Sequence, residues 1–275
     1  MTLSWSAYAV SLTRPDAPPI LDESADLVLK TASVGKLLLL GEVARRLESG
    51  VLQADRRVSK QGARFVRDSG LWHVLDQQDL TVLDACRLVG AVSDNLATNV
   101  LLDLVGLDAV RDFGASIGAP PMELLDYVSD VPRAQRGPGT PPTLSRASAR
   151  SLVGFLTALH NGTVSPLVGE WMSLNTDLSM VAAAFLDDPL AHNAIGGDGA
   201  PPLRNKTGTD DGIRADVGIV GTGTGTGSGS GTGTGTDAVA YAVVANWQSD
   251  DADPGLAAVM TRMRAHGTMI RDVLH

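Results

Sequence analysis

The pattern of hydrophobic and polar positions gives the chain two β-like ends and a helical middle. At the N-terminal end, residues 3–12 alternate apolar and small polar side chains, which is the period of a half-buried strand. Towards the other end, residues 213–220 and 237–247 are runs rich in Val, Ile and Ala, which favour strands. Residues 255–274 show the periodicity of an amphipathic helix, so we expect the chain to close with a helix.

Helical spacing dominates the middle of the chain. The segments in which apolar positions recur at this spacing are 33–48, 80–92, 95–106, 107–118, 144–162, 165–174 and 178–188. Six prolines predict a long irregular loop over residues 119–142, and loops of this length inside compact domains are often functional. Glycine, threonine and serine fill residues 221–236, which predicts an enlarged, flexible hairpin loop.

The order of these elements predicts an α+β fold. An antiparallel sheet, flanked by the terminal helix, is assembled from both ends of the chain, and an all-helical domain is inserted between them. The predicted sheet domain is discontinuous and takes residues 1–30 and 187–275. The helical domain takes residues 31–186, and the active site is expected where the two domains meet.

Composition and charge narrow the range of partners. The formal net charge is −9, which disfavours nucleic acid as a partner because binding to phosphates needs a basic surface. The apolar run at 37–40 is too short to span a bilayer, so no membrane partner is expected. The sequence as given opens without a basic stretch and apolar core, which predicts a cytoplasmic protein; a secreted protein whose signal peptide had been removed would show the same pattern.

Cysteine and histidine indicate no redox or metal chemistry. The single cysteine, Cys86, lies in an apolar helical run and is best interpreted as a small buried core residue. The five histidines show no spacing typical of metal ligands, so we expect neither a metal nor another cofactor.

Ser33 and Lys36 form the first motif that can carry chemistry. Positions three apart share one face of a helix, so the lysine would lie beside the serine hydroxyl. A serine hydroxyl needs a neighbouring base to act as a nucleophile, and a lysine can serve if burial or another cation lowers its pKa. S-x-x-K also recurs by chance, and a capping serine with a surface lysine is the alternative for this motif alone.

Two further motifs follow along the chain. Ser93-Asp94-Asn95 lies between two predicted helices, and alone it is an ordinary helix-start signal. Lys206-Thr207-Gly208-Thr209 precedes a β-like run, and alone it is compatible with a strand entry and a turn glycine. The three motifs together, in this order, make coincidence a poor explanation.

This trio is the signature of class A β-lactamases and related penicillin-binding proteins, which the chain resembles. The resemblance extends to Asn99 in the helix after Ser93, to the stretch GEWMSLNTDLSMVAAAF, and to Arg214 and Asp216 on the next strand. It covers most of residues 3–275. It implies a serine β-lactamase-like fold and a small-molecule substrate, a β-lactam or a related amide or ester.

The resemblance also implies roles for individual residues. Ser33 would attack the lactam carbonyl, and Lys36 would take the proton of its hydroxyl. The backbone N–H groups of Ser33 and Thr209 would form the oxyanion hole, which typically contributes a few kcal/mol. Ser93, held by Lys206, would pass a proton to the departing nitrogen. The substrate-binding residues would be Asn95, Thr207, Gly208, Thr209 and Arg214.

One family feature is missing from the sequence. Hydrolytic class A enzymes carry a glutamate that activates the water for deacylation, and its position falls here on Val128 or Ser129. Glu123, Asp126 and Asp130 lie nearby but outside the register. We therefore expect acylation without fast hydrolysis. The open functions are a slow β-lactamase, a penicillin-binding or sensing protein that does not turn over, and a D-alanyl peptidase or esterase.

Two other features allow more than one interpretation. Residues 114–118 match the G-x-S-x-G nucleophile elbow, but that motif needs a strand before it and a helix after it. Here a helical pattern precedes it and prolines follow, so the elbow is disfavoured. Trp72 fits an aromatic wall of the active-site cleft as well as a buried packing residue.

Overall fold

The computed structural model describes residues 3–190, 203–221, 237–248 and 254–274. The strands are β1 Leu3–Ser11, β2 Leu21–Glu23, β3 Leu29–Lys30, β4 Arg57–Ser59, β5 Asp79–Thr81, β6 Glu123–Leu124, β7 Ser145–Ala147, β8 Leu203–Asp210, β9 Ile213–Gly221 and β10 Ala238–Trp247. The α-helices are α1 Lys36–Glu48, α2 Val82–Val92, α3 Asn95–Val105, α4 Leu107–Ser116, α5 Ala149–His160, α6 Pro166–Met172 and α7 Pro254–Val273. Short 3-10 helices are η1 Ala32–Gly35, η2 Trp72–Val74, η3 Arg133–Gln135 and η4 Val181–Phe185.

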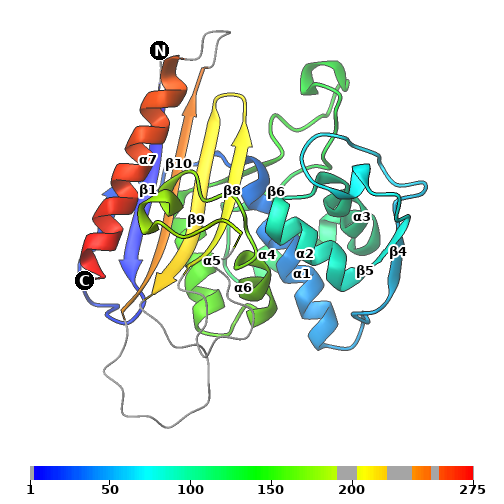
Figure 1. Cartoon of the computed structure of the whole chain (residues 1–275), viewed down its shortest axis with the longest axis horizontal. Helices are drawn as coiled ribbons and strands as arrows, with labels where there is room; N and C mark the ends of the chain where they lie inside the picture. Colours follow the sequence, from blue (N-terminus) through cyan, green and yellow to red (C-terminus); the bar gives the residue numbers. More distant parts are fainter. Residues whose placement is uncertain (1–2, 191–202, 222–236, 249–253, 275) are drawn as a thin grey trace.

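A five-stranded antiparallel sheet brings the two ends of the chain together. Its strand order is β2-β1-β10-β9-β8, so β1 from the N-terminal end pairs with β10 from the C-terminal end. Figure 1 shows this sheet with α7 along it on one side of the molecule and the helices α1, α2 and α3 on the other. The prediction of an α+β fold with an antiparallel sheet, a terminal helix and an inserted helical region is confirmed. The predicted domain boundaries stay a prediction.

The central strand β10 is buried on both faces, which explains its continuous apolar sequence. Ala240, Ala242 and Val244 face the core shared with the helical region. Val239, Tyr241, Val243 and Ala245 face the second core, where they lie with the α7 residues Val259, Met263 and Ile270. The sheet therefore lies between two hydrophobic layers. Packing on both faces holds its strands in place, up to the edge strand β8.

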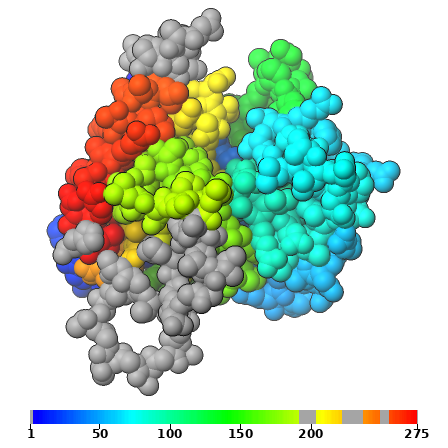
Figure 2. Space-filling view, viewed as in Figure 1, coloured from blue at the N-terminus to red at the C-terminus, as the bar shows by residue number. Residues whose placement is uncertain are grey.

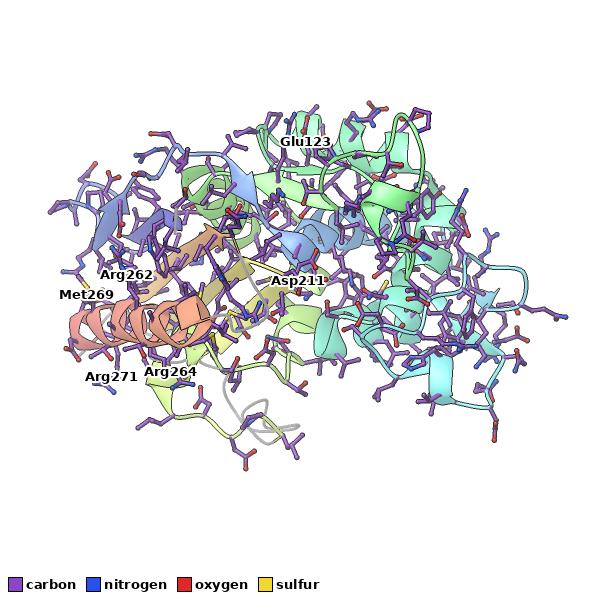
Figure 3. The ribbon with its side chains drawn as sticks, turned by 90° about the horizontal axis from the view of Figure 1, so that it is seen from above. Glu123, Asp211, Arg262, Arg264, Met269 and Arg271 are labelled. Atoms are coloured by element: carbon purple, nitrogen blue, oxygen red, sulfur yellow. The ribbon has the colours of Figure 1, made fainter. Side chains whose placement is uncertain are left out.

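Polar contacts fix α7 to the rest of the sheet layer. Arg262 pairs with Glu23 of β2 at 2.7 Å and lies over the ring of Trp5. Figure 3 shows Arg262, Arg264 and Arg271 on α7, away from Glu123 on the opposite side of the view. Arg271 donates to the carbonyl of Ala184 at 3.0 Å, so the helix also holds η4 in place.

Helix α1 lies in the middle of the helical region. Four successive leucines, Leu37 to Leu40, are buried, as expected for a helix surrounded by protein on all sides. Cys86 of α2 is also buried, and burial raises the pKa of its thiol, so this cysteine is a packing residue. Trp72 is fully buried and its Nε1 donates to the carbonyl of Gln77 at 2.9 Å, which makes it a packing residue and not a wall of the cleft.

Several predicted elements differ from the structure. Segment 178–188 forms only the short helix η4, because the N–H of Ala182 donates to the buried carboxylate of Asp216 and Leu186 adopts a left-handed φ of 62°. The nucleophile-elbow motif begins in helix α4, in agreement with the helical pattern that disfavoured an elbow, and the Ser116 hydroxyl donates to the carbonyl of Phe113. Of the predicted glycine-rich loop, residues 222–236 lie outside the described part of the chain.

The end of the chain and its middle lie on opposite sides of the molecular surface. In Figure 2, residues of the last part of the chain, in orange and red, occupy one side, and residues from about 50 to 100, in blue and cyan, occupy the other. None of the helices in the described ranges is long and apolar enough to cross a membrane.

Candidate active site

The three sequence motifs meet at one cavity of about 300 Å³. Ser33 comes from η1, Ser93 from the α2–α3 junction, and Thr207 from the edge strand β8. The residues that line the cavity are Ser33, Asp68, Ser69, Ala91, Val92, Ser93, Asn95, Asn175, Thr176, Asp177, Thr207 and Thr209. The cavity therefore lies between the sheet and the helical region.

Ser33 is held in a tightly constrained turn. Ala32, immediately before it, is buried and has a φ of 46°, a left-handed conformation that is costly for a residue with a side chain. The Ser145 hydroxyl donates to the carbonyl of Ala32 at 2.5 Å and lies 2.7 Å from the Thr31 hydroxyl. Strand β7 thus fixes the backbone that precedes the candidate nucleophile.

Strand β8 passes very close to this turn. A Cβ added at Gly208 would lie 2.2 Å from the carbonyl oxygen of Thr31 and 3.2 Å from the backbone nitrogen of Ser33. Only glycine permits that approach, which gives the glycine of the third motif a physical reason. The backbone of β8 is consequently brought alongside the backbone of Ser33.

Lys36 is completely buried and points at the α2–α3 junction. Its Nζ donates to the carbonyl of Ser93 at 2.7 Å, to Oδ1 of Asn95 at 2.5 Å, and to Oγ of Ser93 at 3.3 Å. Among the described residues, no hydrogen bond joins Lys36 to the Ser33 hydroxyl. Catalytic hydrogen bonds often form only when substrate is bound, so this geometry is compatible with a base on the neighbouring helical turn.

Ser93 lies where two lysines converge. Its φ of 56° turns the chain sharply at the C-terminal end of α2, and its hydroxyl accepts from Nζ of Lys206 at 3.0 Å. Asp94 then caps α3 by accepting from the N–H of Ala97 at 2.8 Å. The same carboxylate accepts from the N–H groups of Leu71 and Trp72, which ties the loop before α2 to the site.

Burial sets the charge of the two lysines. Burial, together with the neighbouring Lys206, lowers the pKa of Lys36 well below its usual value, while Asp94 and Asp68 oppose the shift. Burial lowers the pKa of Lys206 to about 8, against the opposing charges of Asp177 and Asp216. The lowered pKa makes Lys36 more readily neutral, and so more suited to accept a proton, than an exposed lysine, whereas Lys206, with a pKa of about 8, remains mostly cationic near neutral pH.

A buried polar network lies beneath Lys206. Asn175 donates to Oδ1 of Asn205 at 2.9 Å, and Asn205 donates to Oδ1 of Asp216 at 3.0 Å. Tyr241 also donates to Asp216, at 3.2 Å. Burial nevertheless raises the pKa of Asp216 to about 6. The strand residues around Lys206 are thus fixed by a chain of side-chain hydrogen bonds.

Arg214 is not brought to the cavity. It is cross-strand partner of Thr209, but its Nη1 donates to the carbonyls of Asp210 and Ile213 at 3.0 and 2.7 Å. Its guanidinium lies 5.8 Å from the centre of the Trp247 ring. In this arrangement Arg214 binds the turn between β8 and β9, and the substrate-binding role predicted for it stays a prediction.

The loop expected to carry the deacylating glutamate is anchored to Asn99. Its side chain donates to the carbonyl of Val128 at 2.9 Å and accepts from the N–H of Val128 at 2.9 Å. Neither Val128 nor Ser129 supplies a carboxylate. The helix after Ser93 therefore positions this loop, with an apolar side chain at the anchored position.

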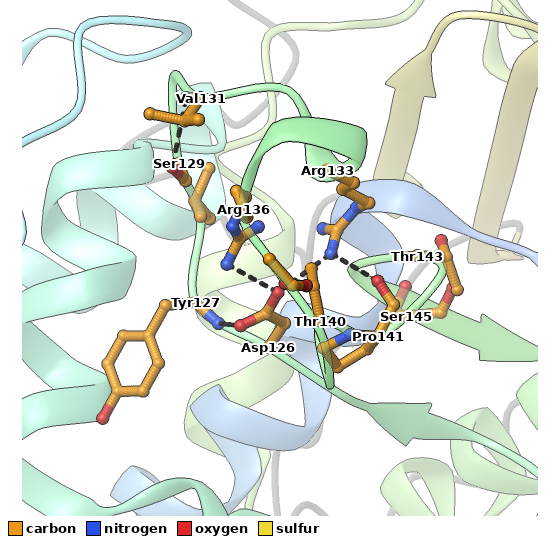
Figure 4. A network of polar contacts seen from close by, with 12 residues as sticks. Asp126, Tyr127, Ser129, Val131, Arg133, Arg136, Thr140, Pro141, Thr143 and Ser145 are labelled. Atoms are coloured by element: carbon orange, nitrogen blue, oxygen red, sulfur yellow. Dashed lines mark hydrogen bonds and ion pairs between the residues drawn. The ribbon is translucent and has the colours of Figure 1, made fainter.

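The acidic residues near that loop are all engaged elsewhere. Figure 4 shows Asp126 between Arg133 and Arg136, at 2.9 and 2.7 Å. Glu123 pairs with Arg146, and Asp130 accepts from the N–H groups of Arg67 and Asp68. Neither Glu123, Asp126 nor Asp130 is part of the cavity lining. The network of Asp126 serves to hold the loop.

Sequence reasoning missed several lining residues. Asp68 and Ser69 come from the irregular segment before η2, and Asn175, Thr176 and Asp177 come from the turn after α6. Asn175 and Thr176 belong to a stretch that resembles the family, but their pattern alone does not indicate a site. Asp68 and Ser69 give no signal in the sequence. Within the described residues, no group of three or more His, Cys, Asp or Glu side chains could hold a metal ion.

Comparisons with known proteins agree with this fold. A family model described as the Beta-lactamase enzyme family matches residues 4–227. The fold is similar to that of PBP-A, with a TM-score of 0.73 and 16% identity over 98% of this chain and 89% of that chain. It is also similar to a β-lactamase from Sphaerobacter thermophilus, with a TM-score of 0.72 and 22% identity over 97% of this chain and 89% of that one.

An ancestral class A β-lactamase gives a third comparison, with a TM-score of 0.70 and 20% identity over 98% of this chain and 94% of that chain. At these identities the structural likeness shows the fold, whereas the family model shows descent. The match of that model to most of the chain gives the conclusion that this protein belongs to the β-lactamase enzyme family and is a serine β-lactamase-like hydrolase.

Proposed function

We propose that β-lactams acylate Ser33 and that the resulting ester is released slowly. The observation that carries this proposal is the convergence of Lys36 and Lys206 on the hydroxyl of Ser93, at 3.3 and 3.0 Å, in a cavity that Ser33 also lines. A buried base, a proton relay and a nucleophile are the groups that an acyl transfer to serine needs.

The first step forms the ester. The Ser33 Oγ attacks the lactam carbonyl carbon, and its proton passes to the neutral Nζ of Lys36. Burial and Lys206 favour that neutral form by lowering the pKa of Lys36. The charge that develops on the carbonyl oxygen is received by the backbone N–H groups of Ser33 and Thr209, and the close approach of Gly208 to the backbone of Thr31 and Ser33 supports this role.

The second event breaks the lactam C–N bond. The Ser93 hydroxyl gives its proton to the departing nitrogen and regains one from Lys36, along the hydrogen bond that joins them. Lys206 keeps the Ser93 hydroxyl oriented and adds positive charge. The hydroxyls of Thr207 and Thr209 are left to bind the substrate carboxylate, since Arg214 is engaged by two backbone carbonyls.

Slow release follows from the loop around Val128. Hydrolysis of the ester needs a base that takes a proton from water, and the acids of this loop are held in ion pairs or by backbone N–H groups. A variant of PBP-A, which shares this fold, has been captured as an acyl-enzyme complex with penicillin G. These observations favour, as a second candidate function, a penicillin-binding protein that stays acylated.

The experiment follows the intact mass of the protein after mixing with benzylpenicillin, alongside turnover of a chromogenic cephalosporin. We expect a stoichiometric adduct that forms within minutes and persists for hours, with turnover limited by its decay. A transient adduct with rapid turnover would contradict slow release. The absence of both adduct and turnover would contradict the β-lactam proposal and direct the search to D-alanyl peptides and other esters.

A further inference from the structure

The cavity carries two acidic side chains that the acylation steps do not use. Asp68 lines one wall, beside Asn95, and Asp177 comes from the turn after α6. Across the described residues, these two are the charged side chains of the cavity lining, since Lys36 and Lys206 lie buried behind it. A substrate entering the cavity therefore meets negative charge first.

Asp177 is held in a fixed orientation. Its Oδ1 accepts from the hydroxyl of Ser179 at 2.7 Å and from the N–H of Ser179 at 3.2 Å. Its backbone carbonyl accepts from Asn175 at 3.1 Å, which links it to the network beneath Lys206. Among the described residues, no hydrogen bond engages the other carboxylate oxygen, Oδ2, so that oxygen remains available to a cation in the cavity that Asp177 lines.

Asp68 is positioned by its backbone while its carboxylate remains free. Its carbonyl accepts from Nδ2 of Asn95 at 2.6 Å, and its N–H donates to Asp130 at 3.4 Å. Among the described residues, no hydrogen bond or ion pair engages the carboxylate itself. Asn95 is one of the predicted substrate-binding residues, so a cationic group on the part of the substrate that lies against Asn95 would also lie near Asp68.

The charges behind the lining do not cancel these carboxylates. Asp94 and Asp216 are buried nearby, so four acidic groups accompany two lysines. Burial and the neighbouring Lys206 lower the pKa of Lys36 and so weaken its positive contribution, whereas Lys206, with a pKa of about 8, contributes one positive charge against these acids. The local excess of negative charge has the sign of the whole chain, whose net charge is −9.

We infer that the cavity selects acyl donors that carry a protonated amine on the acyl side chain, with Asp68 as the main specificity-determining residue and Asp177 as its support. This inference rests on the proposed function, because it names the substrate class for acylation of Ser33. Anionic and neutral acyl side chains would be bound less well, since they gain nothing from either carboxylate.

Aminobenzylpenicillin and benzylpenicillin test the inference because they differ by one amino group. At about pH 6.5, below the ordinary pKa of an α-amino group, that group is cationic. We expect the second-order rate constant for acylation, followed by intact mass, to be about three- to fivefold higher for aminobenzylpenicillin, the size of one exposed ion pair. The ratio should fall towards one in Asp68→Asn and partway in Asp177→Asn.

Asp76→Asn is the matched control. Asp76 is exposed, lies eight residues after Asp68 and does not line the cavity. Its substitution therefore removes one negative charge, as Asp68→Asn does, without changing the cavity lining. It should keep the wild-type ratio. Equal rates for the two penicillins in the wild-type protein, or an unchanged ratio in Asp68→Asn, would overturn the inference while leaving the acylation of Ser33 established.

Binding to Ser33→Ala separates this inference from the proposed function. If neither penicillin acylates the wild-type protein, the proposed function fails, and calorimetric titration of Ser33→Ala with both compounds decides the inference. Tighter binding of aminobenzylpenicillin, abolished when Asp68→Asn is added, supports it. Equal binding of the two penicillins, or binding of neither, overturns it.

Discussion

At the scale of single residues, the site depends on lysines whose charge is set by burial. Lys206 is fully buried, and burial lowers its pKa to about 8. For Lys36, burial and the charge of Lys206 act together to lower the pKa well below its usual value. Each lysine donates to the same hydroxyl, that of Ser93. In the proposed mechanism the neutral form of Lys36 is the base and Lys206 keeps its charge, because the two buried lysines have unequal electrostatic surroundings.

The lowered pKa of Lys206 predicts an alkaline limit to acylation. Its ammonium form is present below about pH 8 and is lost as the pH rises through that value. Because Lys206 is proposed to orient the Ser93 hydroxyl and to add positive charge to the site, the second-order rate constant for acylation by benzylpenicillin should fall above about pH 8. The measurement is stopped-flow or intact-mass kinetics across a pH series.

Lys206→Arg is the control for this limit, because a guanidinium keeps its charge throughout the range. That variant should react more slowly at its optimum but lose the alkaline decline. A wild-type rate that stays constant well above pH 8, or a decline that persists in Lys206→Arg, would show that Lys206 does not set the limit.

At the scale of elements, the junction between α2 and α3 is the structural centre of the site. Ser93 takes a left-handed φ of 56° there. The Asp94 carboxylate accepts hydrogen bonds from three backbone N–H groups, that of Ala97 in α3 and those of Leu71 and Trp72 in the preceding loop. The junction thereby aligns α3, the loop that holds Asp68, and the hydroxyl of Ser93. A motif that looks like a simple helix start is in fact a connection between three parts of the cavity wall.

Asp94→Ala should destabilise the protein by about 2–4 kcal/mol, because it removes a helix cap and leaves the buried N–H of Trp72 and the partly buried N–H of Leu71 without an acceptor. Urea unfolding followed by circular dichroism measures the change. Asp112→Ala, at an exposed position of α4, is the control and should cost less than about 0.5 kcal/mol. Similar losses in the two variants would contradict the role of Asp94.

The loop over residues 119–142 has no carboxylate at the position where the resemblance to class A enzymes led us to expect the deacylating glutamate. Asn99 holds the backbone of Val128 by two hydrogen bonds, and Asp126 holds the loop through Arg133 and Arg136. The loop is therefore well anchored, and what it lacks is a carboxylate at the anchored position.

Val128→Glu should accelerate release of the ester. A carboxylate on the anchored backbone can take a proton from water, and general-base catalysis typically contributes about 100-fold or more. Decay of the benzylpenicillin adduct, followed by intact mass, measures the effect, and Val128→Gln, which has the same shape without the charge, should leave the decay slow. Equal decay in the Glu and Gln variants would show that a base at this position does not control release.

At the scale of the whole molecule, the fold can be predicted from the hydrophobic patterns of the sequence. Alternation in β1 and the apolar runs of β9 and β10 predict a sheet built from both chain ends, and the structure has that sheet. The order of the three motifs predicts a meeting of Ser33, Ser93 and Lys206, which tertiary packing brings about over long separations in sequence.

Other parts of the site could not be predicted, for physical reasons. Asp68 and Asp177 reach the cavity through irregular segments whose course depends on hydrogen bonds to Asn95 and Asn175. Arg214 was predicted to face the substrate, but the turn after β8 supplies two carbonyls that hold its guanidinium elsewhere. Side-chain direction at such positions is decided by tertiary contacts, which carry no periodic signal in the sequence.

The central claim is that one hydroxyl, that of Ser33, forms the covalent bond, and peptide mapping after exposure to benzylpenicillin tests it most directly. The wild-type protein should carry one adduct, on the peptide that contains Ser33, and Ser33→Ala should carry none. Lys36→Ala, which keeps the nucleophile but removes the base, should be labelled at least about 100-fold more slowly. An adduct that survives in Ser33→Ala, or that maps to another residue, would contradict the account.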